Sequence, residues 1–448
     1  APPSPLTEDE IDEVLQDLVC WYDNPDLARD CLPPGEEFLA QIERVALSDE
    51  PRFIAPLVDM LWLELGWERW VREALERVSG ERFASASDWY AWMTASPPPL
   101  PDGYAEWKGR LLSVIDPSFV EIIPEAAAIN GPGPEQLVWA LVRGDAVPPL
   151  VEPENVHRVE ELYLQDSNIV FGVVVDGVQR AYPERIIGWH GSVTDVVNGT
   201  PLIIWHCPSC GGATAFNRTA SNGANYTFSA SGFVWESRRL FRDAETSSLW
   251  DAVSGRAVAG PLAEAGVHLT PRVSVRTTWG EWAARYPNTR VLSLETGFVR
   301  NYDEAAYLTD DLEQGRPPFP VPRFDDRLAP MELVFAVSIG GSRKAYPLAA
   351  VESAGVVRDT VGGVDIVILS PGSGRGVTAY ETLGTFFGGL SGPADDRVVM
   401  DGDEIAWFVD DERLLNTRNS RVRTSVPAQV ARWFAWSGAY PETDVWEP

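Results

Sequence analysis

The stretch PLIIWHCPSCGG, from Pro201 to Gly212, contains the residues of this chain whose types and spacing are best suited to chemistry. Its apolar run predicts a buried strand that ends at His206, Cys207 and Cys210. Two cysteines three residues apart suit three different roles: soft ligands for a metal ion, a redox-active dithiol, or a structural disulfide. The rest of the sequence narrows this choice only in part.

A metal site needs further donors beside the two sulfurs. Thiolates and imidazoles suit copper, zinc or iron, and His190, at the end of a short helix predicted over PERIIGWH, can supply a third ligand. His206 is a weaker candidate, because it precedes Cys207 on the strand and its side chain starts on the opposite face. No second Cys-x-x-Cys offers a fourth ligand, so an open site is favoured, with copper as the expected metal and zinc as the alternative.

The redox and haem roles find less support in the local sequence. In thioredoxin-like proteins the dithiol opens a helix, whose N-terminus lowers the pKa of the cysteine. Here Gly211 and Gly212 lead into another β-like run. Gly211 also stands where covalent haem attachment requires a histidine. A plain Cys207–Cys210 disulfide that holds a tight turn remains open.

An internal repeat dominates the second half of the chain. VFGVVVDGVQRAYP at Val170–Pro183 recurs as VFAVSIGGSRKAYP at Val334–Pro347, and an offset of 164 residues carries the alignment without a gap to Asn217 and Glu381. ARYPNTRV and GAYPETDV extend the similarity further toward the C-terminus. Self-similarity of this length predicts two copies of one structural unit.

The repeat separates residues that serve the fold from residues that serve a site. Residues kept in both copies are predicted to be turn and packing residues: Asp195 and Asp359, Gly199 and Gly363, and the Tyr-Pro pairs that end at Pro183 and Pro347. The candidate ligands His190, His206, Cys207 and Cys210 instead align with Ala354, Ser370, Pro371 and Gly374. The function of these four residues therefore belongs to the first copy alone.

Two other patterns are weaker candidates for chemistry. GSGRG at Gly372–Gly376 lacks the helix and the lysine of a phosphate-binding loop, which argues against nucleotide binding. Asp243 and Asp251, in FRDAETSSLWD, could be catalytic carboxylates. With 66 acidic residues in the chain, we expect solvated or turn-forming roles for both.

The elements that must position these residues predict an α+β fold. Thr7 and Glu10 have the spacing of a capping box, and further helical periodicity follows, whereas the sequence after Glu160 alternates valine-rich runs with turn residues. We predict a helical N-terminal domain (1–85), a helical or linker connection (86–155), a β-rich repeat that carries the site (156–320) and a second repeat without it (321–448).

Composition bounds the location and the partners. The formal net charge of −30 argues against a nucleic acid or an anionic membrane surface as partner, and no apolar run is long enough to span a bilayer. The start APPSPLTEDE lacks a methionine, so we expect a mature end left after removal of a signal peptide, and an extracytoplasmic location. There Cys20 and Cys31 could form a second disulfide or remain buried thiols.

An ordered set of motifs resembles a bacterial family known as domain of unknown function 3179, from about Trp89 to the C-terminus. The set includes LVWALVRGDAVPPL, GWHGSVTDVVNGTPLIIWHCPSCGG, SGFVWESRRLFRDAETSSLWD and WAARYPNTRVLSLETGFVRNY. The family's Trp-His corresponds to Trp189 and His190, and its Cys-x-x-Cys-Gly to Cys207, Cys210 and Gly211. This chain departs from the family pattern at Gly191, Thr194, His206 and Phe241. Since Phe241 replaces a common methionine, a copper site with a thioether ligand loses support. The resemblance implies an extracytoplasmic bacterial protein and no particular activity.

Two hypotheses follow. In the first, the protein is an extracytoplasmic metalloprotein, with copper held by Cys207, Cys210 and His190, and acts as an oxidoreductase or a metal carrier. In the second, it is a non-enzymatic interaction or assembly module that binds a protein partner or itself, with a Cys207–Cys210 disulfide and tryptophan-rich segments available for the surface. The sequence fixes neither a reaction nor a substrate.

Overall fold

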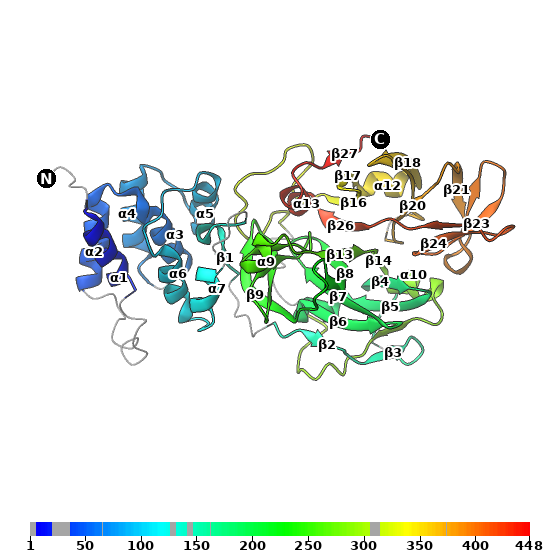
Figure 1. Ribbon diagram of the computed structural model, residues 1–448, viewed down its shortest axis with the longest axis horizontal. Helices are drawn as coiled ribbons and strands as arrows, with labels where there is room; N and C mark the ends of the chain where they lie inside the picture. Colours follow the sequence, from blue (N-terminus) through cyan, green and yellow to red (C-terminus); the bar gives the residue numbers. More distant parts are fainter. Residues whose placement is uncertain are drawn as a thin grey trace.

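The computed structural model describes residues 6–19, 36–64, 66–125, 131–140, 147–161, 163–304, 314–372 and 374–448. A helical region occupies one end of the long axis and β-sheets fill the rest (Figure 1). The predicted α+β class is confirmed. Within these ranges, no helix is both long and apolar enough to cross a membrane. Cys20 and Cys31 lie outside the described residues, so their pairing stays a prediction.

The N-terminal region is a bundle of short helices around one core. Thr7 caps the first helix through the predicted capping box with Glu10. The hydrophobic cluster of this bundle includes residues of all its α-helices, from Ile11 to Ile123, so the later helices share a core with the earlier ones across position 85. Its helices are α1 (Glu8–Asp17), α2 (Glu36–Ser48), η1 (Pro51–Phe53), α3 (Ile54–Trp62), α4 (Glu68–Ser79), α5 (Ala86–Ala95), α6 (Tyr104–Ser113) and α7 (Phe119–Glu125).

A buried ion pair holds this bundle against the segment that follows it. Lys108 Nζ lies 2.7 Å from Asp59 Oδ1, and the two side chains are buried, with exposed fractions of 1% and 2%. The ammonium also donates to the carbonyls of Pro134 (2.9 Å) and Leu137 (2.8 Å), in the chain that leads into the β-sheets. Lys108 therefore connects the helical bundle to the β-rich part.

The two β-rich units repeat the same order of elements. The first contains β4 (Ile169–Val175), β5 (Val178–Pro183), α8 (Glu184–His190), β6 (Ser192–Val197), β7 (Thr200–Cys207) and β8 (Gly212–Ala220). The second contains β16 (Leu333–Ile339), β17 (Ser342–Pro347), α12 (Leu348–Ala354), β18 (Val356–Val361), β19 (Val364–Leu369) and β20 (Thr378–Glu381). The first five elements of each list begin 164 residues apart, as the aligned sequences predict.

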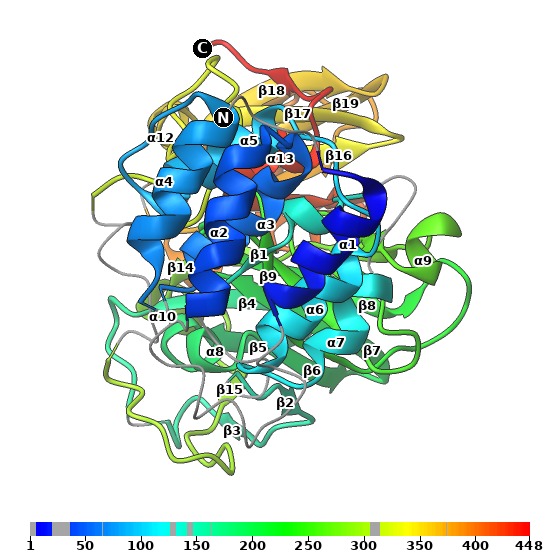
Figure 2. The same cartoon turned by 90° about the vertical axis from the view of Figure 1, so that its left-hand side faces the viewer.

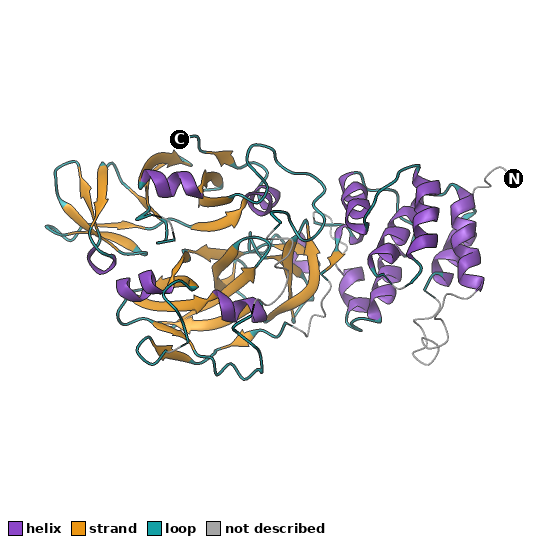
Figure 3. Ribbon diagram, turned by 180° about the vertical axis from the view of Figure 1, so that it is seen from behind, coloured by secondary structure: helices purple, strands orange, loops and turns teal. Residues whose placement is uncertain are grey.

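Each unit adds a separate sheet and a terminal strand–helix–strand segment, which Figure 3 shows from behind. In the first unit these are β9 (Phe228–Trp235), β10 (Arg238–Asp243), β11 (Leu249–Asp251), β12 (Ala257–Ala259), α9 (Pro261–Glu264), β13 (Leu269–Arg272), β14 (Val275–Thr278), α10 (Trp279–Arg285) and β15 (Arg290–Leu292). In the second they are β21 (Phe387–Ser391), η4 (Ala394–Asp396), β22 (Val398–Asp401), β23 (Ala406–Val409), β24 (Arg413–Asn416), β25 (Val422–Thr424), β26 (Ala428–Arg432), α13 (Trp433–Ala439) and β27 (Asp444–Val445). The short elements η2 (Pro134–Gln136), β1 (Val138–Trp139), β2 (Leu150–Val151) and β3 (Asn155–His157) precede both units.

The sheet topologies correspond as well. In the first unit the strand orders are β14-β4-β5-β15-β3, β13-β8-β7-β6-β2 and β1-β9-β10-β11-β12. In the second they are β26-β16-β17-β27, β18-β19-β20 and β21-β22-β23-β24-β25. The second unit therefore retains the central strands of each sheet, and its described residues form no counterpart of β1, β2, β3 or β13.

Residues shared by the two copies have matching contacts. The Tyr182 hydroxyl donates to Asp195 at 3.0 Å, and the Tyr346 hydroxyl donates to Asp359 at 2.9 Å. These aspartates lie within β6 and β18, so their role is packing between strands and not turn formation. The predicted turn role holds for the conserved glycine, since Gly199 has a φ of +77°, a left-handed conformation that suits glycine.

Reciprocal backbone hydrogen bonds join the two units. The amide of Arg432, at the end of β26, donates to the carbonyl of Cys210 at 2.6 Å. The amide of Thr278, at the corresponding end of β14, donates to the carbonyl of Gly374 at 3.1 Å. Cys210 and Gly374 are themselves aligned in the repeat. The two units thus meet through an approximately two-fold symmetric junction, in which each turn is held by the other unit.

Candidate functional site

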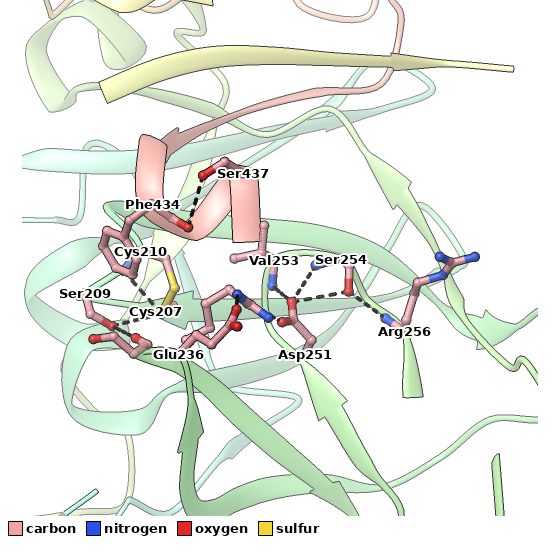
Figure 4. A network of polar contacts seen from close by, with 12 residues as sticks. Cys207, Ser209, Cys210, Glu236, Asp251, Val253, Ser254, Arg256, Phe434 and Ser437 are labelled. Atoms are coloured by element: carbon pink, nitrogen blue, oxygen red, sulfur yellow. Dashed lines mark hydrogen bonds and ion pairs between the residues drawn. A yellow bond between two sulfur atoms is a disulfide. The ribbon is translucent and has the colours of Figure 1, made fainter. Parts of the chain in front are cut away.

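The two candidate cysteines lie together in the turn between β7 and β8, where they form a disulfide (Figure 4). The Cys210 amide donates to the Cys207 carbonyl at 3.0 Å, which closes the turn. Ser209 Oγ lies 3.3 Å from Cys207 Sγ and donates to the Ser237 carbonyl at 2.7 Å. The turn is therefore fixed both by the bridge and by the β9–β10 hairpin.

The same turn is packed against the second unit. Cys207 and Cys210 are each 3% exposed, within an apolar cluster that includes Trp433 and Phe434 of α13. Gly211 follows with a φ of +90°, and a Cβ at this position would lie 2.8 Å from Cγ of Arg432. The close approach of the two units therefore requires glycine here.

Buried carboxylates beside the turn stabilise backbone. Asp251 accepts hydrogen bonds from the amides of Val253 and Ser254, both at 2.8 Å (Figure 4). It also accepts from Arg238 Nε at 2.6 Å. Asp243 accepts from the Thr246 amide at 2.6 Å. The expected turn-forming role is confirmed for both aspartates, but solvation is not, because both side chains are buried. The sequence around each aspartate predicts a turn, but it does not predict that other parts of the chain bury that turn.

His190 lies at the end of α8 in a chain of hydrogen bonds. Its Nδ1 is 2.9 Å from the Pro148 carbonyl, and its Nε2 is 2.7 Å from the Tyr302 hydroxyl. The Tyr302 oxygen is in turn 2.6 Å from Thr296 Oγ1. Burial, together with the nearby charge of Arg300, lowers the pKa of His190, against the effect of the hydrogen bond to Pro148. Since a carbonyl only accepts, Nδ1–H donates to Pro148, and in the neutral ring Nε2 accepts from the tyrosine.

Sequence reasoning missed Tyr302 and Thr296 as partners of His190. Both lie in LETGFVRNY, more than a hundred residues downstream, and neither has a spacing that indicates a ligand. The quoted similarity of this segment to the family was the only signal that could have drawn attention to it.

His206 lies on the opposite face of β7 from Cys207, as the strand geometry predicts. Its ring packs against Phe171, with centroids 6.0 Å apart, whereas Cys207 belongs to the cluster on the other side. Its Nε2 lies 3.5 Å from Glu184 Oε1, too far for a strong hydrogen bond, and Nδ1 has no hydrogen-bond partner within the described part of the chain. Burial lowers the pKa of His206, although Glu184 opposes this effect.

His206 and Glu184 belong to a charged cluster that reaches across the junction. Burial raises the pKa of Glu184, but three neighbouring groups together lower it. These groups are His206, Arg276 on β14 and Arg432 on β26. In the other copy of the repeat, the equivalent positions have different, uncharged residues: Leu348 for Glu184, Ser370 for His206, Val430 for Arg276 and Thr278 for Arg432. The fold therefore forms the same junction without these charges, and the cluster is particular to the side that holds the disulfide.

The structure brings together only part of the candidate ligand set. Cys207 and Cys210 are joined, whereas the ring nitrogens of His190 face Pro148 and Tyr302, and His206 lies on the other face of the strand. Among the residues with described positions, no three His, Cys, Asp or Glu side chains gather closely enough to hold a metal ion.

Comparison with known proteins places the site within one family. A family model described as "Protein of unknown function (DUF3179)" matches residues 144–443, which include the first β-rich unit, the second as far as α13, and all four candidate residues. The helices α1 to α7 lie outside the matched range. No curated protein and no solved structure matches the chain.

Proposed function

Since the chain belongs to the DUF3179 family, whose description names no activity, we propose its function from its own site: a non-enzymatic, extracytoplasmic interaction and assembly module, stapled by the Cys207–Cys210 disulfide. One observation carries this proposal. Both cysteines are buried where the two units meet, and the Cys210 carbonyl accepts the Arg432 amide. Disulfides persist in oxidising compartments, which supports a location outside the cytoplasm.

Burial favours a staple over a catalytic dithiol. Thiol–disulfide exchange requires an attacking thiolate to reach one of the two sulfurs, and here both cysteines are covered by the apolar cluster. A bridge that closes a four-residue loop limits the freedom of the unfolded chain, which contributes about 2 kcal/mol of stability by the loop-entropy relation. The bridge also fixes the direction of the Cys210 carbonyl, and so the junction with β26.

The test is a thiol and metal inventory of protein purified from its native compartment. We expect Cys207 and Cys210 to resist alkylation before reduction, slow reduction by dithiothreitol in the native state, and no stoichiometric metal. A Cys207→Ser, Cys210→Ser variant should lose about 2 kcal/mol of unfolding free energy. Free thiols accompanied by about one equivalent of copper or zinc would contradict the proposal.

A copper or zinc protein, acting as an oxidoreductase or a carrier, is the second candidate, and one observation favours it. A metal-bound histidine usually donates its other ring N–H to a carbonyl or a carboxylate, and His190 Nδ1 already faces the Pro148 carbonyl. This candidate needs a reduced cysteine pair, and it needs His190 Nε2 to leave Tyr302. Metal that is lost in His190→Ala and in Cys207→Ser, but kept in His206→Ala, would support it.

A further inference from the structure

An apolar row crosses the outer face of the last sheet, β21–β25. Val398 pairs with Phe408, Phe408 with Leu415, and Leu415 with Val422, so these four side chains share one face. Phe408 is 45% exposed and Val422 40% exposed. The opposite face, with Trp407, is buried in a separate core. The sheet thus presents a continuous apolar row across four strands to solvent.

The first unit contains a matching sheet. Phe228 meets Trp250 edge to face at 5.2 Å, and Phe387 meets Trp407 in the same way at 5.3 Å. These pairs occupy the inner faces of the sheets β9–β12 and β21–β25 respectively. The outer faces of the two sheets are therefore equivalent surfaces.

In the first unit this outer face is covered by helices. Leu240, Leu249 and Ala259 of β10, β11 and β12 belong to the hydrophobic cluster of the helical bundle. The ring centroids of Phe119 on α7 and Phe233 on β9 are 4.6 Å apart. Figure 1 shows the bundle against this sheet at one end of the molecule, and β21, β23 and β24 at the far end. The duplicated surface has no cover from the described part of this chain.

Charge indicates what kind of helical surface would fit. The β24–β25 hairpin, Arg413–Thr424, contains four arginines and no acidic residue, in a chain of net charge −30. Arg413, Arg418 and Arg421 are exposed, whereas Arg423 lies on the inner face, over the ring of Trp407 at 5.1 Å. The three exposed arginines therefore place positive charge at the β24–β25 end of the apolar row, which favours an acidic partner there.

The opposite end of the chain has the complementary character. Helices α1, α2 and α4 lie side by side there (Figure 2) and together contain twelve acidic and four basic residues. Between α2 and α4 runs a groove of about 450 Å³, lined in part by Leu39, Ile42 and Trp70. Trp70 is 38% exposed. This end thus combines negative charge with an accessible apolar groove.

We propose that the outer face of β21–β25 binds the α1, α2 and α4 end of a second copy of this chain, so that copies associate head to tail. This inference rests on the proposed role as an assembly module and names its partner. The two surfaces lie at opposite ends of the long axis, so the sheet surface of one chain cannot contact the helical surface of the same chain. A head-to-tail contact that does not close into a ring extends into a filament.

Sedimentation velocity of the full-length protein tests the inference. We expect association that grows with concentration and weakens in 0.5 M salt, because the contact is partly electrostatic. Phe408→Glu and Trp70→Glu should each weaken association at least about tenfold, as expected for a central aromatic contact. Val299→Glu, on a 96% exposed residue away from both surfaces, serves as the control and should change nothing.

A mixing experiment separates head-to-tail association from any other kind. Phe408→Glu retains an intact helical end and Trp70→Glu an intact sheet end, so an equimolar mixture should form dimers and nothing larger. Wild-type protein that stays monomeric at several hundred micromolar would overturn the inference, as would undiminished association of Phe408→Glu. The thiol inventory tests a separate claim. An intact disulfide in a monomeric protein would support the structural role of Cys207–Cys210 and contradict only the contact between copies.

Discussion

The two lysines of this chain make a matched pair for measuring the contribution of burial to an ion pair. Lys108 and Lys344 each lie 2.7 Å from an aspartate, Asp59 and Asp359 respectively. The Lys108 pair is 1% and 2% exposed, whereas Lys344 and Asp359 are 22% and 18% exposed. The same substitution at both positions should therefore give very different losses of stability.

For Lys108→Met we expect a loss of about 3–5 kcal/mol, because the Asp59 charge stays buried without its counter-ion. The Tyr90 and Tyr104 hydroxyls still donate to Asp59 but carry no charge, and the carbonyl of Leu137 loses its donor. For Lys344→Met we expect less than about 1 kcal/mol, since solvent screens and replaces the partner.

Urea unfolding followed by circular dichroism at 222 nm measures the helical bundle, and tryptophan fluorescence follows the whole chain. In Lys108→Met the helical signal should be lost at lower urea than the rest, because this lysine connects the bundle to the β-rich part. Adding Asp59→Asn should recover part of the loss, since it removes the unpaired charge. Equal losses for the two lysine variants, or no recovery in the double variant, would refute the reasoning.

Two further predictions concern the junction. Gly211→Ala should destabilise the protein by about 1–3 kcal/mol, because its Cβ would meet Arg432. Gly177→Ala is the control: Gly177 also has a positive φ but open space around it, so this variant should lose stability only through backbone strain. Thermal melts of the two variants measure the difference. Stability should fall as pH drops below about 6.5, because burial lowers the pKa of His206 and of His190 in the folded state and the unfolded chain then binds more protons. Urea midpoints at pH 7.5 and 5.5 measure this loss, and His206→Ser, the residue of the second copy, should reduce it; an unchanged difference would contradict this assignment.

Local patterns predicted local structure well. The capping box follows from the spacing of Thr7 and Glu10, and the opposite orientations of His206 and Cys207 follow from the two-residue period of a strand. The short helix that ends at His190 was also predicted from its local sequence. The repeat predicted the matching order of elements because two similar sequences meet the same packing constraints. None of these inferences required knowledge of contacts between distant segments.

What the sequence could not predict depends on such contacts. Arg432 reaches Cys210 from more than two hundred residues away, and no pattern in either segment indicates the other. The tryptophan-rich segments, expected to be available for the surface, are mostly internal: Trp205, Trp250 and Trp433 are fully buried, because the faces of their sheets and helices are covered by layers formed elsewhere in the chain. Periodicity shows which residues share a face but not what covers that face.

The reciprocal hydrogen bonds between the units also suggest a history. A contact in which each half offers the same groups to the other is the contact of a symmetric homodimer, so the chain has the form expected of two identical subunits fused by gene duplication. In a homodimer every substitution appears twice, on both sides of the axis. Fusion ends that coupling, so the two halves are free to differ, and the turn that has Cys207 and Cys210 in one half has Pro371 and Gly374 in the other.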